Sequence, residues 1–314
     1  MKNYSTTYKP FKYEKAMEFA ESHERIHWIH DEADLSSDIK DWQRNLTPQE
    51  KNLVHQILKL FTQSDVSVGG AYIDKLLPLV KNNEIRNMYI SFAAREGIHQ
   101  RAYAALNDTL NLPESDYALF LQYSEMANKI EFIDREGDEL ALLLVRMIFA
   151  EGVGLFGSFS MLLNFQRFGK LKGMGEIVRW SILDENQHVD GHIYVLKEYL
   201  AENPFLVTDA FKKEIYNLAR EVYALEEKFI DLVYAEGDIE GLKATEVKQY
   251  MKYLVDRRLI QIGLKGNFGV TDNPLTWFDE IIGASEHANF FEAKVTDYQK
   301  GGMVGDWGDA WKAS

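Results

Sequence analysis

The chain has 314 residues, of which 46% are hydrophobic, and a formal net charge of −14 at pH 7. This acidity argues against nucleic acid or an anionic membrane surface as a partner. The absence of cysteine excludes disulfides, zinc–thiolate and iron–sulfur sites, and a thiol nucleophile. The N-terminus lacks the apolar core of a signal peptide, and the longest apolar run, residues 140–150, contains Arg146 and is too short to span a bilayer. We therefore expect a soluble, cytoplasmic protein.

Apolar residues recur at helical spacing along most of the chain, and no segment alternates clearly enough to indicate a sheet. The sequence therefore predicts an all-α protein. The expected helices are 14–25, one from 48 past 65, one from 83 to 110, 115–135, one from 138 to 168, 172–203, 208–236, 245–264 and 275–282. Thr47-Pro48-Gln49-Glu50 is a capping box with proline at the first helical position, and Gly69-Gly70 predicts a kink. No linker divides the chain, so we expect one domain over residues 1–314, with an N-terminal arm at 1–46 and a flexible tail at about 299–314.

The most informative segment is Arg95-Glu96-Gly97-Ile98-His99-Gln100-Arg101-Ala102-Tyr103. On a helix, Glu96 and His99 share a face, and Tyr103 lies one turn beyond His99. A carboxylate and an imidazole so placed form half of a metal site. One such pair occurs by chance in many helices, and alone it also fits a solvated polar edge.

A second copy of the motif changes this interpretation. Glu185 and His188 repeat the pair in Asp184-Glu185-Asn186-Gln187-His188. Each pair also follows an acid set among apolar helical residues, because Asp65 lies 31 positions before Glu96 and Glu151 lies 34 positions before Glu185. An ionised carboxylate in such a helix is costly unless it is paired or bound to metal. An acid followed by Glu-x-x-His, twice, is the pattern of a four-helix dimetal carboxylate site.

Together these motifs resemble those of the small, radical-generating subunit of class I ribonucleotide reductase. The likeness runs from Trp28 to the tail and includes Asn273-Pro274-Leu275-Thr276-Trp277, and Asn289-Phe290-Phe291-Glu292 followed by Tyr298. It implies a ferritin-like helical bundle, usually a homodimer, with a dimetal carboxylate site in the four core helices. The metal ligands that it implies are Asp65, Glu96, His99, Glu151, Glu185 and His188.

The resemblance also implies roles outside the ligand set. Tyr103 matches the tyrosine that becomes a stable radical in many members, and Trp28 and Asp184 match the start of the radical-transfer route. Tyr298 matches the tail tyrosine that passes the radical to the large subunit. That partner would supply the nucleotide site and the cysteines that this chain lacks. Without the resemblance, Tyr103 also fits an ordinary core tyrosine, although its offset from the ligands favours a redox role, and Trp28 fits an anchor for the arm equally well.

The identity of the metals and two other functions stay open. Carboxylates and imidazoles suit either iron or manganese, although the compact length favours Mn/Mn over Fe/Fe. Some members of the family need a flavodoxin-like activase and others do not. The other functions are a ligand-binding oxidase or hydroxylase on the same scaffold, whose first ligand is typically glutamate where this chain has Asp65, and a ferritin-like metal store. His192 is expected to support the site or lie at the surface, and His23 to be an ordinary histidine.

Overall fold

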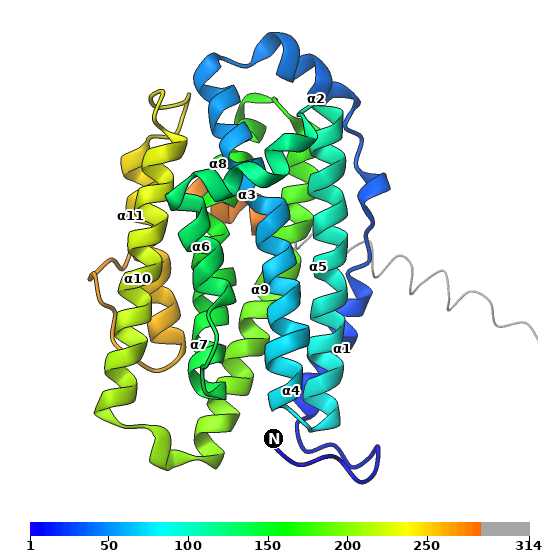
Figure 1. Cartoon of the computed structure of the whole chain (residues 1–314), viewed down its shortest axis with the longest axis vertical. Coiled ribbons are helices and arrows are strands. Elements are labelled where there is room, and N and C mark those ends of the chain that lie inside the picture. The colour runs from blue at the N-terminus through cyan, green and yellow to red at the C-terminus, as the bar shows by residue number, and fades with distance from the viewer. Residues whose placement is uncertain (284–314) are drawn as a thin grey trace, which may run out of the picture.

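The computed structural model describes residues 1–283, which form a bundle of long helices with shorter segments across its ends (Figure 1). The α-helices are α1 (Glu14–Arg25), α2 (Ser36–Lys40), α3 (Pro48–Gly70), α4 (Leu77–Leu79), α5 (Asn83–Thr109), α6 (Ser124–Asp134), α7 (Leu140–Phe149), α8 (Phe156–Leu163), α9 (Lys172–Glu202), α10 (Asp209–Val233) and α11 (Ala244–Gln261). Within residues 1–283 there is no strand, so the all-α prediction is confirmed. That all 314 residues form one domain stays a prediction, and the expected tail lies outside the described residues.

The centre of the bundle is built from α3, α5, α7 and α9. In it α3 packs against α5, α7 against α9, and α5 against α9. The helix starts are fixed as the sequence predicts. The Thr47 hydroxyl accepts from the Glu50 backbone N–H while the Glu50 carboxylate accepts from the Thr47 N–H, and the Asn82 side chain caps α5. These caps set the helical phase of the segments that carry Asp65 and Glu96.

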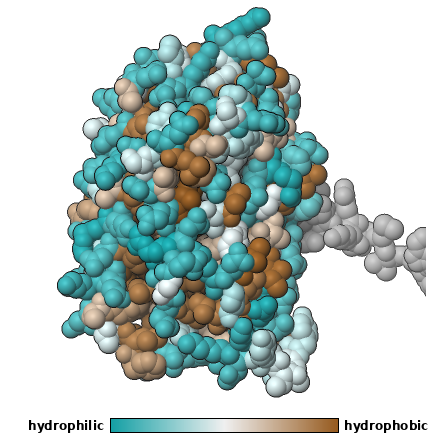
Figure 2. Space-filling model, viewed as in Figure 1, coloured by the Kyte–Doolittle hydropathy of each residue, from teal (hydrophilic) through white to brown (hydrophobic). Residues whose placement is uncertain are grey.

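The apolar run that the sequence analysis noted at residues 140–150 is the first part of a longer apolar helix. Leu140–Phe168 is long and apolar enough to cross a membrane by length and composition, but 94% of its most apolar window is buried inside the bundle. Its side chains therefore already have protein partners, as in the core helix of a globular protein. Hydrophilic residues cover most of the face seen in Figure 2, with smaller hydrophobic patches between them.

Two expected helices are present but less regular than the sequence predicts. The expected helix at 115–135 is a 3-10 segment, Glu114–Gln122, followed by the shorter α6. The expected helix around Glu151 is interrupted by a π-helical segment, Ala150–Gly154. A second π segment, Ala71–Leu76, continues α3 where the kink was expected. Single π turns inside α-helices are rare and occur frequently at functional sites.

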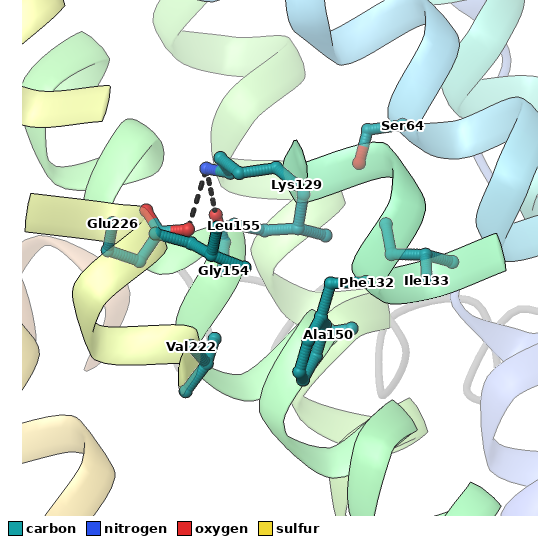
Figure 3. Close-up of a pocket in the computed structure, with 10 residues that line it drawn as sticks. Ser64, Lys129, Phe132, Ile133, Ala150, Gly154, Leu155, Val222 and Glu226 are labelled. Atoms are coloured by element: carbon teal, nitrogen blue, oxygen red, sulfur yellow. Dashed lines mark hydrogen bonds and ion pairs between the residues drawn. The ribbon is translucent and has the colours of Figure 1, made fainter. Parts of the chain in front are cut away.

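Cationic side chains bind the carbonyl groups of the π segment that carries Glu151. Lys129 reaches across from α6 and donates from Nζ to the Gly154 carbonyl at 3.1 Å, while its ammonium pairs with Glu226 of α10 at 2.7 Å (Figure 3). Arg258 of α11 donates from Nε to the Gly152 carbonyl at 3.1 Å. A Cβ at Gly152 would lie only 2.6 Å from that Nε, so glycine permits this approach. The irregular turn is therefore held from two neighbouring helices.

The N-terminal arm lies against the bundle and is fixed at both ends. The carboxylate of Asp38 accepts from the backbone N–H groups of Gly173 and Met174 at the start of α9, where a negative charge suits the helix dipole. At the other end, Lys12 and Tyr13 bind the carboxylate of Glu202 at the end of α9. Between these anchors, the arm brings His23 and Trp28 into the core.

Candidate metal centre

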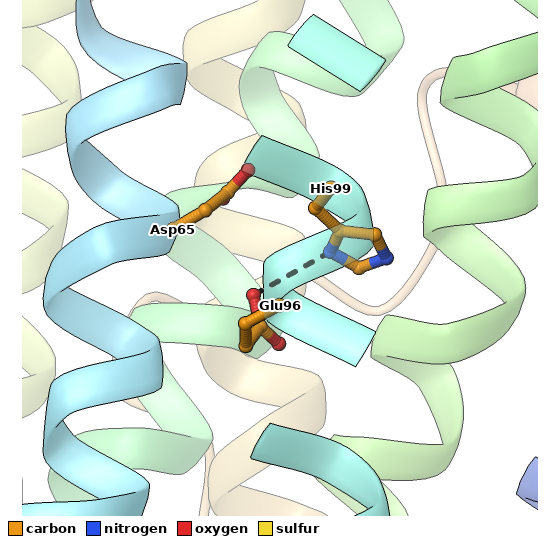
Figure 4. Close-up of side chains that lie close together, drawn as sticks. All are labelled: Asp65, Glu96 and His99. Atoms are coloured by element: carbon orange, nitrogen blue, oxygen red, sulfur yellow. Dashed lines mark ion pairs between the residues drawn. The ribbon is translucent and has the colours of Figure 1, made fainter. Parts of the chain in front are cut away.

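Six side chains that the sequence singled out come together in the middle of the bundle. Asp65 comes from α3, Glu96 and His99 from α5, Glu151 from the π segment, and Glu185 and His188 from α9. All six are at most 2% exposed. Two groups have donor atoms within 4.8 Å of one another: Asp65, Glu96 and His99 in one, and Glu96, Glu185 and His188 in the other. Figure 4 shows the first group, in which Asp65 on α3 and the pair on α5 face the same space. Glu96 belongs to both groups.

Both histidines turn the same ring nitrogen toward the carboxylates. Nδ1 of His188 lies 3.2 Å from Glu96, 3.3 Å from Glu151 and 3.4 Å from Glu185. Nδ1 of His99 lies 3.4 Å from a carboxylate oxygen of Glu96 and 3.4 Å from one of Glu185. A single ring nitrogen cannot donate one proton to several carboxylates at once. The arrangement instead suits nitrogen and oxygen lone pairs that share a cation.

The six side chains are suited to bind two divalent metal ions. Several of its buried atoms have no hydrogen-bond partner: Asp65 Oδ2, both carboxylate oxygens of Glu96, both of Glu185, and His188 Nδ1. Buried polar atoms normally have hydrogen-bond partners, so a cluster of buried atoms without partners needs an explanation. Burial together with the nearby charge of Glu96 raises the pKa of both Asp65 and Glu185. Four carboxylates and two imidazoles around one space are the ligands of hard divalent cations such as iron or manganese.

Trp28, Asp184 and His99 form a hydrogen-bonded chain that leads away from the cluster. The Trp28 indole donates from Nε1 to Asp184 Oδ2 at 2.8 Å, and Nε2 of His99 lies 3.1 Å from the same oxygen. The Trp28 and His99 rings are also stacked, with centroids 5.7 Å apart. The structure thus brings together the Trp28 and Asp184 that the sequence analysis named, and joins both to a predicted ligand.

Arg95 links these hydrogen-bonded side chains to the N-terminal arm, a contact that the sequence analysis missed. Its Nε lies 3.5 Å from Asp184, and its guanidinium donates to the backbone carbonyls of His23, Ile26 and Trp28. Arg95 precedes Glu96 in α5, so one helical turn holds both the arm and the cluster. Its partners lie in the arm and in α9, so no local sequence pattern indicates this role.

His23 was expected to be an ordinary histidine, but it lies against the cluster. It is 1% exposed, its Nε2 is 3.1 Å from Nε2 of His188, and the same atom is 3.5 Å from Asp184. Burial, followed by the charge of His188, lowers the pKa of His23. It therefore faces the outer nitrogen of a predicted ligand as a neutral ring. Its partners lie about 160 positions away in the chain, which local sequence patterns do not reveal.

Tyr103 is buried near the Asp65 side of the cluster, and its surroundings are mostly apolar. Its ring packs edge-on against Phe61 with centroids 4.8 Å apart, and its hydroxyl donates to Ser181 Oγ at 3.2 Å. The Ser181 hydroxyl in turn donates to the Ile177 carbonyl. Burial, followed by the charge of Asp65, raises the pKa of Tyr103. The phenol is therefore neutral, and its redox role stays a prediction.

On the Glu151 side, Tyr72 and His192 both contact the carboxylate. The Tyr72 hydroxyl lies 2.8 and 3.0 Å from the two oxygens of Glu151 and 3.0 Å from Nε2 of His192. Nε2 of His192 is also 3.2 Å from Glu151, so His192 supports the site rather than lying at the surface. Burial raises the pKa of Glu151, but the charge and hydrogen bond of His192, together with the nearby His188 ring, outweigh it and lower the pKa to about 2. Tyr298, the last residue singled out from the sequence, lies outside the described residues.

The similarity to known proteins extends over nearly the whole chain. The family model "Ribonucleotide reductase, small chain" matches residues 5–274. The probable ribonucleoside-diphosphate reductase small subunit 048L of Invertebrate iridescent virus 3 is 37% identical, and the match covers 96% of this chain and 86% of that protein. Two solved structures share the fold at lower identity. They are the dimanganese(II)-NrdF of Streptococcus sanguinis (TM-score 0.76, 22% identical, 85% of this chain and 94% of that one) and the Rnr4 homodimer of Saccharomyces cerevisiae (TM-score 0.74, 21% identical, 95% and 90%).

Proposed function

The chain belongs to the ribonucleotide reductase small-chain family, and we propose that its six convergent side chains bind the two metal ions of that subunit. As the small subunit of a ribonucleoside-diphosphate reductase, the chain generates the radical that its large subunit uses. The ligand-binding oxidase and the metal store are not favoured. The single observation that supports the proposed site is the set of orphaned, buried donor atoms that face one another at its centre.

Within this site each group has a distinct task. Glu96 belongs to both groups of donors and would supply a carboxylate ligand to the centre from either group. When bound, the metals supply an oxidising equivalent after reaction with oxygen or a reduced oxygen species. The apolar core around the ligands keeps water away, and the bonds of His99 to Asp184 and of His188 to His23 fix the ring orientations. The chain Trp28–Asp184–His99 is proposed as the exit route toward the large subunit.

For the metals themselves we propose manganese. The same ligands accept iron and manganese, so the proposal is supported by the compact length of the chain and by its likeness to a protein described as dimanganese(II). Metal analysis of protein isolated from its native cells, combined with electron paramagnetic resonance, distinguishes the two. A diiron centre in the active protein would contradict the manganese assignment and leave the ligand assignment standing.

The small subunit of a reductase works with a large subunit, and further partners are proposed here. A homodimer is supported by the likeness to the Rnr4 homodimer. A cytoplasmic location is proposed together with a flavodoxin-like activase that supplies the oxidant to a manganese centre. The tail is proposed to dock on the large subunit, so deletion of residues 301–314 should weaken that binding. Unchanged affinity after the deletion would refute the docking role.

The site is tested by comparing two buried glutamates of α5. Glu96→Ala removes the shared carboxylate, so we expect the purified subunit to lose both metal ions in elemental analysis and in Mn²⁺ titration. Glu84→Ala is the matched control, because Glu84 is also buried but binds the backbone of the arm at Lys12. The control should keep two ions per chain. Normal metal content in Glu96→Ala would refute the assignment.

A further inference from the structure

A polar cavity of about 210 Å³ lies between α8, α9, α11 and the last described residues. Its walls include Asn186 of α9, which follows the predicted ligand Glu185, and Arg258 of α11, which donates to the carbonyl of Gly152. Gly152 in turn follows Glu151. The cavity therefore borders two of the turns that carry predicted ligands, and no part of the proposed function uses it.

Two adjacent arginines of α11 line this cavity. Arg258 is 5% exposed, and its guanidinium donates to two neutral acceptors, the Gly152 carbonyl at 3.1 Å and the Gln261 side-chain oxygen at 2.9 Å. Arg257 lies at the more exposed rim and donates from Nη1 to the Tyr253 hydroxyl at 3.1 Å. All of these acceptors are uncharged, so none of them neutralises either guanidinium.

No carboxylate of the described chain balances the two charges. The buried Arg146 pairs with Asp138, whereas neither Arg257 nor Arg258 forms an ion pair within residues 1–283. A guanidinium that is removed from water is costly unless an opposite charge compensates it. Burial, followed by the charge of Arg257, lowers the pKa of Arg258 to about 10, so this guanidinium is still protonated at neutral pH. A bound anion would relieve both effects.

The other polar groups of the cavity suit the same ligand. Asn186 and Tyr250 line it, and the described contacts give neither side chain a hydrogen-bond partner. Asp279 also lines it, but its Oδ2 already accepts from Asn273 at 2.8 Å. Two cations against this acid leave the lining positive, in a chain whose formal net charge is −14. Guanidinium, amide and phenol donors around one space are suited to the oxygen atoms of an anion.

We propose that this cavity binds a small oxyanion of the phosphate type, held by Arg257 and Arg258 and by the donors of Asn186 and Tyr250. Guanidinium groups bind phosphate oxygens through pairs of parallel N–H groups, which favours phosphate over a monatomic anion such as chloride. Pockets for larger organic ligands typically measure about 300–1,000 Å³, so the smaller volume here favours a free ion over a phosphate carried by a nucleotide.

The test uses the purified full-length subunit with its metals bound, after removal of unbound ions. Isothermal titration calorimetry with sodium phosphate at low ionic strength should show binding that Arg257→Gln weakens about tenfold or more, because one charge-assisted hydrogen bond contributes at least that much. Arg25→Gln is the matched control, since it removes the same charge from a side chain that is 79% exposed at the end of α1. It should bind phosphate as the wild type does. Equal affinities of Arg257→Gln and wild type, which binding at the metals would give, overturn the proposal, as does a wild type that binds no phosphate.

A second measurement needs no variant and so does not depend on the folding of one. Phenylglyoxal modifies accessible arginine side chains, and mass spectrometry gives the rate at each of them. Phosphate should slow the modification of Arg257 but not of Arg25, and chloride at the same ionic strength should slow neither. Adenosine monophosphate should protect Arg257 no better than phosphate does. Loss of the difference between the two arginines, or stronger protection by the nucleotide, would contradict a site for a free oxyanion.

Discussion

The Trp28 indole and the Asp184 carboxylate, 156 positions apart in the chain, are joined by a hydrogen bond of 2.8 Å from Nε1 to Oδ2. Trp28→Phe removes the donor but keeps an aromatic ring over His99. A hydrogen bond to a charged group contributes about 1.5–3 kcal/mol, so we expect reductase turnover with the large subunit to fall about 10- to 100-fold. Metal content should not change.

The neighbouring indole provides the control for this prediction. Trp180 packs against Trp28 with ring centroids 5.2 Å apart, but the described contacts include no hydrogen bond from it to Asp184. Trp180→Phe should therefore retain most of the turnover. Equal losses in the two variants would show that aromatic packing, rather than the bond to Asp184, carries the effect.

The buried pair of Lys129 and Glu226 should stabilise the π segment. Lys129→Met removes the ammonium and leaves the Glu226 carboxylate without a charged partner, a loss of about 3–5 kcal/mol in the free energy of unfolding. Chemical denaturation at fixed subunit concentration measures it. The double variant Lys129→Met/Glu226→Gln should recover part of the loss, because the orphaned charge is gone. Wild-type stability in Lys129→Met would contradict the assigned role.

Glu202 should make the stability of the arm depend on pH. Burial raises the pKa of this carboxyl, but hydrogen bonds from Lys12 and Tyr13 outweigh it and lower the pKa from 4.5 to about 2. When a carboxyl has a lower pKa in the folded state than in the unfolded state, it stabilises the fold fully at pH values above its unfolded-state pKa. This stabilisation is lost as the pH falls through the folded-state pKa. The difference in melting temperature between wild type and Glu202→Gln should thus be largest above pH 4.5 and shrink toward pH 2. Glu198→Gln, one turn earlier, is the control. A difference that does not vary with pH would contradict the assignment.

Tyr298 should be essential for activity without affecting the metal centre. Phenylalanine keeps nearly the same volume and removes the redox-active hydroxyl, so Tyr298→Phe is expected to load and oxidise its metals normally but to lose ribonucleotide reduction in the presence of the large subunit. Tyr4→Phe, at a tyrosine that is 71% exposed, is the control and should stay active. A fully active Tyr298→Phe would exclude the tail tyrosine from the transfer route.

Sequence patterns were most reliable where the signal is local. The helix at 14–25, the capping box at Thr47 and the two Glu-x-x-His faces depend on residues a few positions apart, and the structure has all of them. His23 and Arg95 were missed because their partners come from distant segments. The apolar run around Glu151 has the same periodicity whether its turn is α or π, so the irregular turn left no sign in the sequence. The cationic residues that hydrogen-bond to this turn, Lys129 and Arg258, lie on other helices.

The π turn at Ala150–Gly154 also affects how the chain is aligned with its relatives. Such a turn behaves as one extra residue in an α-helix, and each residue of an α-helix advances the side chains by about 100°. Positions counted at regular α-helical spacing from Glu151 therefore fall out of phase beyond Gly154. An aligned relative without the extra residue would show a one-residue gap here, and an ungapped alignment would assign the inward face of α8 to the wrong side chains.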